Sequence, residues 1–261
     1  MERGIPKIKL NKKIFQKKII IFYLALVVLS SCAKSSDQPF GIASRHHLAT
    51  DIGMNILLEG GNAVDAAVAV SFALAVVNPS AGNLGGGGFM LIHQSETDKT
   101  IALDYRERAP IKSFEKMFLD HNENVIKGLS LNSTLASGVP GTVSGMFYAS
   151  KKFGSMKIEK LISPSIEIAK NGFVLSEFQA KNINKYRGKF LKNNEAKKIF
   201  TKPNGFKEGD VLIQKNLANT LERISKNGEK EFYSGETAKK ISEFFKENNG
   251  ILSLEDLRQY K

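Results

Sequence analysis

Cysteine and tryptophan are the residues that this sequence lacks. Its 261 residues include one cysteine and no tryptophan, and aromatic residues make up 9%. A single cysteine excludes a disulfide within the chain and any metal or redox site built on a Cys-x-x-Cys pair. The scarcity of aromatic rings disfavours an aromatic cage for a ligand. With 42% hydrophobic and 25% charged residues, the composition is that of a globular protein.

The net charge of +12 is unevenly distributed. Residues 1–31 carry seven Lys or Arg side chains and one Glu, which accounts for half of that charge. The remainder is only mildly basic over 230 residues, so the sequence does not indicate a nucleic-acid partner.

The N-terminal segment is typical of an export signal. Basic residues precede an apolar run over 19–29, which is too short for a bilayer span of about 20 residues. Leu29-Ser30-Ser31-Cys32 then resembles a bacterial lipobox, in which the cysteine is lipidated; a chance cysteine after an ordinary signal peptide is the alternative. We therefore expect a signal peptide over 1–31, a lipid anchor at Cys32, a tether over 32–40, and a periplasmic or cell-surface protein.

Two helices are predicted at the start of the region 41–261. Apolar residues at helical spacing indicate an amphipathic helix over 45–59, which Gly60-Gly61 ends. Asn62 is a candidate N-cap for a second helix over 63–77, with Asp65 at the third position. This second helix is apolar nearly all round and rich in alanine, so we expect it to be buried on several sides.

A glycine-rich segment and a hairpin follow. Gly82 and Gly85-Gly86-Gly87-Gly88 precede predicted strands over 89–93 and 100–105. A phosphate loop requires a Lys-Ser/Thr pair after its last glycine, and a dinucleotide fingerprint requires the order strand, glycines, helix; neither pattern is met. The glycines are instead expected to form a turn with positive φ that packs closely against other elements.

The C-terminal part is predicted to be mostly helical. Gly228 and Gly250 are expected to end two of its helices, and Ser253 with Asp256 to cap a last one. The lysine-rich stretch 181–202 is expected to be a solvated surface. The apolar residues expected to share a face are Leu217, Leu221 and Ile224 in the first helix, and Ala238, Ile241, Phe244 and Phe245 in the second.

The four histidines do not form a metal-binding pattern. His46 and His47 are adjacent and are expected to point to different sides of a helix, while His93 and His121 lie in separate segments. A metal site commonly needs ligands at compatible spacing, such as i and i+4 on a helix. We therefore expect no metal site.

Arg106 is the strongest candidate for a binding residue. It stands at the end of a hairpin strand, before the Pro110 loop, and an arginine fork binds a carboxylate through two parallel hydrogen bonds. A structural ion pair with Asp104 or Glu107 is an equal alternative on these grounds. No nucleophile is recognisable, because the chain has no Gly-x-Ser-x-Gly elbow and no cysteine beyond the signal region.

Several motifs together resemble one known family, the large subunit of γ-glutamyltransferase (γ-glutamyl transpeptidase), in order over residues 41–261. Arg106 matches the family's arginine that holds the α-carboxylate of the γ-glutamyl group. The carrying segments are Gly60–Ala69, Gly85–Leu91, Leu103–Pro110, Gly138–Gly145, Ser163–Ser165 through Asn171–Phe173, and Phe232–Gly235.

The resemblance implies an N-terminal nucleophile hydrolase fold, an α/β architecture in which two packed sheets lie between helix layers (an αββα sandwich). It implies a precursor that cleaves itself, so that the new N-terminal threonine of a small subunit becomes the nucleophile. The expected substrate is glutathione or another γ-glutamyl compound, and the acceptor is an amino acid, a peptide or water. No cofactor is expected. Tyr105 and Glu107 are expected to support Arg106.

The sequence departs from the family in one large respect. The segment with the nucleophilic threonine is absent, so we expect an incomplete sandwich, no catalytic residue within this chain, and dependence on a small subunit. Two alternatives stay open: a non-catalytic exported lipoprotein that binds glutamate-like ligands, and a related acylase acting on poly-γ-glutamate or β-lactam side chains.

Overall fold

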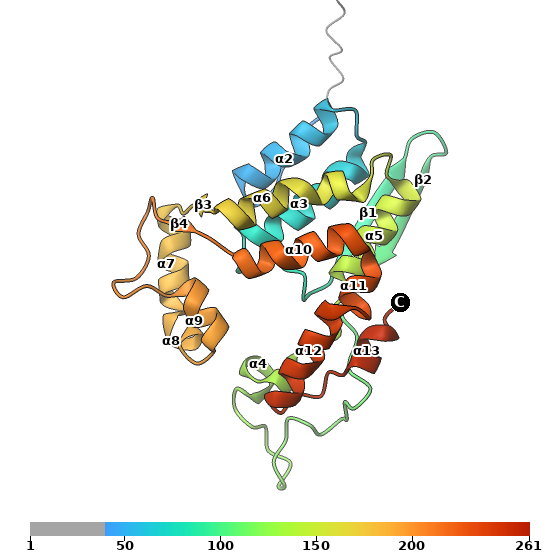
Figure 1. The fold of residues 1–261 in the computed structure, drawn as a ribbon. Coiled ribbons are helices and arrows are strands. Elements are labelled where there is room, and N and C mark those ends of the chain that lie inside the picture. The colour runs from blue at the N-terminus through green and yellow to red at the C-terminus, as the bar shows by residue number, and fades with distance from the viewer. Residues whose placement is uncertain (1–39) are drawn as a thin grey trace, which may run out of the picture. The chain divides into compact units, whose positions relative to one another are not determined.

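The computed structural model describes residues 40–261. The predicted signal peptide, the lipidation site Cys32 and nearly all of the predicted tether lie outside the described residues. Figure 1 shows the helices and strands in chain order. The helices are α2 His47–Leu58, α3 Ala63–Val77, α4 Leu129–Asn132, α5 Thr142–Phe153, α6 Ile158–Asn171, α7 Glu177–Lys185, α8 Arg187–Phe190, α9 Asn194–Phe200, α10 Lys215–Asn227, α11 Glu229–Tyr233, α12 Glu236–Glu247 and α13 Leu254–Arg258, with a 3₁₀ turn, η1, at Thr134–Ala136. The strands are β1 Phe89–Gln94, β2 Lys99–Asp104, β3 Phe173–Val174 and β4 Val211–Leu212.

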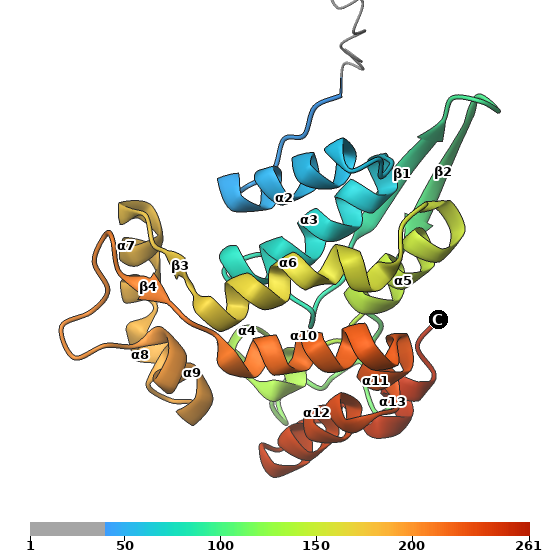
Figure 2. The ribbon, with the colours of Figure 1, turned by 45° about the horizontal axis from the view of Figure 1, so that its top comes forward.

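The buried helix α3 is the centre of the core. It packs against α2 on one side and α6 on another, and α10 lies against the far side of α6 (Figure 2). Phe72, Val68 and Val76 are almost wholly inaccessible, and each such side chain contributes about 1.5–3 kcal/mol through burial. The prediction of a helix buried on several sides is confirmed, since its alanines let α2 and α6 approach.

A buried carboxylate fixes the start of α3. Asn62 and Asp65 form the predicted capping box, in which the Asn62 backbone N–H donates to Asp65 Oδ2 at 2.9 Å. Asp65 is fully buried and also accepts hydrogen bonds from the backbone N–H and hydroxyl of Ser155 and from the N–H of Met156. The carboxylate therefore joins the start of α3 to the loop that follows α5.

The strands β1 and β2 form the predicted antiparallel hairpin, with Phe89 opposite Asp104. One face of the hairpin packs on the core through Ile92, which is 8% exposed. The other face presents Phe89 and Leu91, which are 65% and 75% exposed. Because side chains alternate along a strand, the hairpin has one covered face and one open apolar face.

The C-terminal helices form a further layer. Leu221 and Ile224 of α10 are buried as predicted, and Gly228 ends that helix with a φ of +75°. On α12, Ala238 is buried but Phe244 is 42% exposed, so the prediction that Phe244 shares a face with Ala238 is wrong. The packing area between α12 and its neighbours reaches Ala238 and Phe245 without extending around the helix to Phe244.

The described residues form a helix-rich α/β structure with two separate two-stranded sheets, β1–β2 and β3–β4. The short β3–β4 pair leads to and from the segment that carries α7, α8 and α9. Residues 40–261 therefore hold one hairpin of the expected packed sheets, and the αββα sandwich is incomplete within them, as predicted.

Candidate functional site

Arg106 follows directly after the hairpin. Tyr105 extends the pairing, since its N–H donates to the Gly88 carbonyl at 3.0 Å and its own carbonyl accepts from the Gly88 N–H at 3.2 Å. By strand alternation, Arg106 lies on the same open face as Phe89. Its guanidinium carbon stands 5.8 Å from the centre of the Phe89 ring, and its side chain is 62% exposed.

The Arg106 guanidinium makes one contact with an acidic neighbour and leaves its two terminal nitrogens without an acceptor among the described residues. Arg106 Nε lies 3.5 Å from Glu107 Oε2, so Glu107 contacts the side of the guanidinium. Within residues 40–261 no acceptor bonds the two terminal nitrogens of that group, while Asp104 accepts only the Arg106 backbone N–H at 3.0 Å. An arginine whose two terminal nitrogens bond no acceptor keeps a pair of parallel donors for a carboxylate.

Three chain segments converge behind Arg106. Arg108 and Val139 form an isolated antiparallel bridge, with N–H to carbonyl distances of 3.2 and 2.7 Å. The N–H groups of Gly141 and Thr142 both donate to the Gly86 carbonyl, at 2.7 and 2.9 Å. The glycine run, the strand end and the turn before α5 are therefore tied together by backbone hydrogen bonds.

The glycine run packs closely against the backbone around Arg106, as predicted. A Cβ on Gly87 would overlap the carbonyl oxygen of Tyr105 and lie 2.8 Å from the Glu107 nitrogen. The prediction of positive φ in this run is wrong, because the glycines with positive φ lie at positions 60, 128, 172, 205, 209 and 228. Glycine is required at position 87 to leave space for the segment 105–107, and not to allow a positive φ.

Two tyrosines that the sequence did not single out as site residues complete the site. The Tyr260 hydroxyl donates to the carbonyl of Arg106 at 2.8 Å, and its ring stacks on Tyr233 with centroids 5.5 Å apart. The Tyr233 hydroxyl donates to the Pro140 carbonyl at 2.9 Å and accepts from the Ser144 N–H at 3.1 Å. Burial raises the pKa of both hydroxyls, so both remain donors at neutral pH.

Only part of this tyrosine pair has a sequence signal. Tyr233 belongs to the Phe232–Gly235 segment that carries the family resemblance, but nothing in its spacing links it to Arg106. Tyr260 lies 154 residues after Arg106 and has no local motif. A contact over that separation is formed by tertiary packing, so no periodicity in the sequence reports it.

The histidines are arranged differently from the prediction. His46 is the N-cap of α2, outside the helix proper, and its ring stacks on His47 with centroids 4.5 Å apart. The prediction that the two point to different sides is therefore wrong, because helical geometry does not govern a cap residue. Among residues 40–261, no group of three or more His, Cys, Asp or Glu side chains is placed to hold a metal ion.

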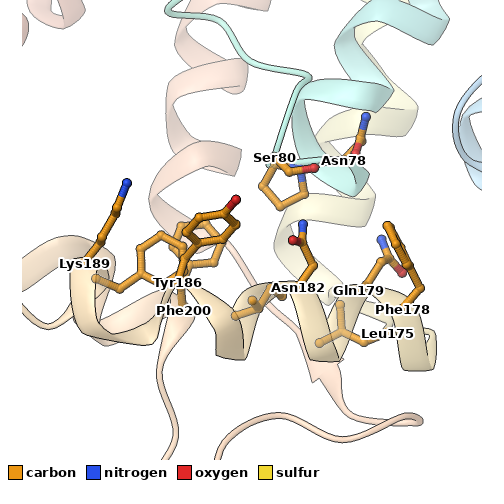
Figure 3. Close-up of a pocket in the computed structure, with 12 residues that line it drawn as sticks. Asn78, Ser80, Leu175, Phe178, Gln179, Asn182, Tyr186, Lys189 and Phe200 are labelled. Atoms are coloured by element: carbon orange, nitrogen blue, oxygen red, sulfur yellow. Dashed lines mark hydrogen bonds between the residues drawn. The ribbon is translucent and has the colours of Figure 1, made fainter. Parts of the chain in front are cut away.

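Three hollows of the described surface are lined by residues other than Arg106. One of them has a volume of about 340 Å³ and is lined by Asn78 and Ser80 after α3 and by Gln179 and Asn182 of α7. Figure 3 shows these side chains. A second, of about 1080 Å³, lies beside His46 and Phe173. Arg106 lines neither of these hollows, nor a third one beside Phe153, and its side chain is 62% exposed.

None of the helices between residues 40 and 261 combines the length and the apolar character that crossing a bilayer requires.

A family model and several related proteins assign this chain to the same family. The family model described as gamma-glutamyltranspeptidase matches residues 49–261. A protein of Escherichia coli strain K12 named glutathione hydrolase proenzyme is 48% identical over 222 residues, which are 84% of this chain and 38% of that protein. A protein of Pseudomonas sp. strain A14 with the same name is 42% identical, covering 97% of this chain and 45% of that protein.

The fold agrees with a solved structure. The crystal structure of Helicobacter pylori gamma-glutamyltranspeptidase matches with a TM-score of 0.84 at 47% identity, covering 87% of this chain and 65% of that chain. The likeness confirms the predicted N-terminal nucleophile hydrolase fold class. The chain spans less than half the length of the two curated relatives described above.

Proposed function

Since the chain belongs to the γ-glutamyltranspeptidase family, we propose that it forms the N-terminal part of the large subunit of a γ-glutamyltransferase. The enzyme would cleave the γ-glutamyl bond of glutathione and related compounds, and pass the γ-glutamyl group to an amino acid, a peptide or water. The proposal takes its substrate class from the names of the relatives, which are glutathione hydrolase proenzymes and a gamma-glutamyltranspeptidase.

One observation carries the role of this chain within that reaction. The two terminal guanidinium nitrogens of Arg106 bond no acceptor within residues 40–261, and the backbone on both sides of Arg106 is hydrogen-bonded. A fork with two free donors on a fixed backbone suits the α-carboxylate of a γ-glutamyl group. Glu107, in contact with Arg106 Nε, would limit the rotation of the guanidinium plane.

The chemical steps would fall to a small subunit. Its N-terminal threonine would attack the γ-amide carbonyl, with its own α-amine as the base, and the acyl-enzyme would then react with the acceptor. Arg106 would hold the donor so that the γ-carbonyl meets the threonine hydroxyl, a contribution of proximity and orientation. This chain would thus supply substrate binding without supplying the nucleophile.

The open face of the hairpin supports a contact with that subunit. Phe89 and Leu91 are mostly exposed on the face that also carries Arg106. Large apolar side chains gathered on a strand face commonly mark an interaction surface. Coverage of this face would remove water from around Arg106 and strengthen its ion pair with the substrate.

Replacing Arg106 tests the proposal. In the complete enzyme, which adds the rest of the large subunit and the small subunit to this chain, Arg106→Ala is expected to lower kcat/KM for a γ-glutamyl anilide by about 30- to 150-fold, which corresponds to ~2–3 kcal/mol for charge-assisted hydrogen bonds. Arg45→Ala removes an exposed arginine before α2 and serves as the matched control with unchanged activity. Undiminished activity of Arg106→Ala would refute the binding role, and an inactive wild-type assembly would refute the proposed reaction.

We also propose that the mature chain is exported and anchored by a lipid on Cys32. The support is the sequence alone: a basic segment, an apolar run over 19–29 and a small-residue stretch before the only cysteine. Cells grown with radioactive palmitate are expected to label the wild-type protein and the control Ser36→Ala, but not Cys32→Ala. Equal label in Cys32→Ala would contradict the anchor.

A further inference from the structure

Tyr260 joins the C-terminal end of the described chain to the backbone of Arg106. We propose that Tyr260 is a positioning residue for Arg106, which fixes the direction of the guanidinium by holding the Arg106 carbonyl. The proposal rests on the role of Arg106 in binding the donor carboxylate. It adds a residue that does not itself touch the substrate.

The backbone of Arg106 is restrained at both of its peptide groups. Its N–H donates to Asp104 Oδ1 at 3.0 Å, and its carbonyl accepts from the Tyr260 hydroxyl at 2.8 Å. The two bonds fix the peptide planes before and after the Cα atom, and these planes set the direction in which the side chain leaves. Without the Tyr260 bond, only the N-terminal side of Arg106 would be held directly.

Tyr260 is itself held on several sides. Its ring stacks on Tyr233 with an interplanar angle of 14°, and the Arg108 guanidinium lies 5.6 Å from its centre. Tyr233 is bonded to the Pro140 carbonyl, which precedes the turn that supports the Arg106 segment. These contacts fix the Tyr260 ring, so that its hydroxyl is positioned to donate a hydrogen bond to the Arg106 carbonyl.

The helix that precedes Tyr260 is anchored to the same loop. Asp256 in α13 accepts a hydrogen bond from the Ile111 N–H at 2.6 Å, and it also caps its own helix through Ser253. Asp256 and Tyr260 thus hold the chain at Ile111 and at Arg106, five residues apart. The segment that contains α13 and Tyr260 therefore restrains residues 106–111 at both ends.

The first test removes only the hydroxyl. In the same complete enzyme, Tyr260→Phe keeps the stacked ring and is expected to raise KM for a γ-glutamyl anilide about three- to tenfold, while kcat stays within about twofold. A higher KM with an unchanged kcat indicates weaker binding of the γ-glutamyl substrate without loss of the chemical step. Tyr148→Phe is the matched control, because Tyr148 is 54% exposed and its hydroxyl makes no hydrogen bond with the described residues; its constants are expected to be unchanged.

A double variant separates this inference from the proposed function. If Tyr260 acts through Arg106, adding Tyr260→Phe to Arg106→Ala has no further effect on KM, since the group being positioned is gone. A full additional increase in KM would overturn the positioning role. If Arg106→Ala alone has no effect, the binding role of Arg106 fails; if Arg106→Ala weakens binding and Tyr260→Phe equals wild type, only the present inference fails.

A measurement of backbone hydrogen exchange in the assembled enzyme gives a result that does not depend on activity. Hydrogen exchange of the Arg108 N–H, which bonds the Val139 carbonyl, is expected to be about tenfold faster in Tyr260→Phe than in wild type or Tyr148→Phe. Amides in α3 serve as the internal reference for global stability. Equal exchange at Arg108 in all three proteins would show that Tyr260 does not hold the segment, and would overturn the inference without an activity assay.

Discussion

Asp65→Ala is expected to lower the free energy of unfolding by about 3–5 kcal/mol, the range for a buried network that loses its acceptor. Four donors bond this carboxylate: the N–H of Asn62, the N–H and hydroxyl of Ser155, and the N–H of Met156. Alanine leaves these donors without a partner at the junction of α3 and the loop after α5. Denaturant unfolding at pH 7 measures the loss.

The matched control is Asp51→Ala, which removes an exposed aspartate from α2. Its unfolding free energy is expected to change by less than about 0.5 kcal/mol, as for most surface substitutions. A loss in Asp65→Ala no larger than in Asp51→Ala would contradict the importance of the network.

The effect of Asp65 also depends on pH. Burial alone raises the pKa of this carboxyl, but the hydrogen bonds from Ser155, Asn62 and Met156 outweigh burial and hold the pKa below its ordinary value of 3.8. Its stabilisation is then fully present above the pKa of the unfolded chain and is lost as pH falls through the lower folded-state value. The difference between wild type and Asp65→Ala is therefore expected to narrow below about pH 4.

Gly141→Ala is expected to destabilise the protein by at least about 3 kcal/mol through overpacking. A Cβ at this position would overlap the carbonyl oxygen of Tyr105, which precedes Arg106, and the hydroxyl of Tyr260, which donates to the Arg106 carbonyl. The φ of Gly141 is −114°, so alanine brings no backbone strain and the effect is purely steric. Thermal unfolding and the γ-glutamyl anilide assay measure the loss of stability and of donor binding.

Gly188→Ala is the matched control for this substitution. A Cβ on Gly188, in α8, meets nothing within 4 Å, and alanine favours a helix over glycine by roughly 0.5–1 kcal/mol. We expect unchanged or slightly higher stability and unchanged donor binding. Wild-type behaviour of Gly141→Ala would mean that the turn before α5 can move away from Tyr105, against the tight packing described above.

The ends of the elements were predictable because they depend on neighbouring residues. The capping boxes Asn62–Asp65 and Ser253–Asp256 form as expected, since a side chain three residues away reaches the helix end by local geometry. Gly60 and Gly228 end helices with positive φ, a conformation open to glycine. The β1–β2 hairpin likewise follows from two short apolar runs and the polar turn between them.

The surroundings of Arg106 were decided by tertiary packing. The sequence identified the arginine and its place after a strand, and it left the ion pair and the free fork as equal alternatives. The structure brings Tyr260 to its carbonyl from 154 residues away and makes Gly87 and Gly141 necessary for space. Local patterns determine where helices and strands begin and end, whereas contacts between distant segments depend on how those elements pack, and packing has no signature in the spacing of residues along the chain.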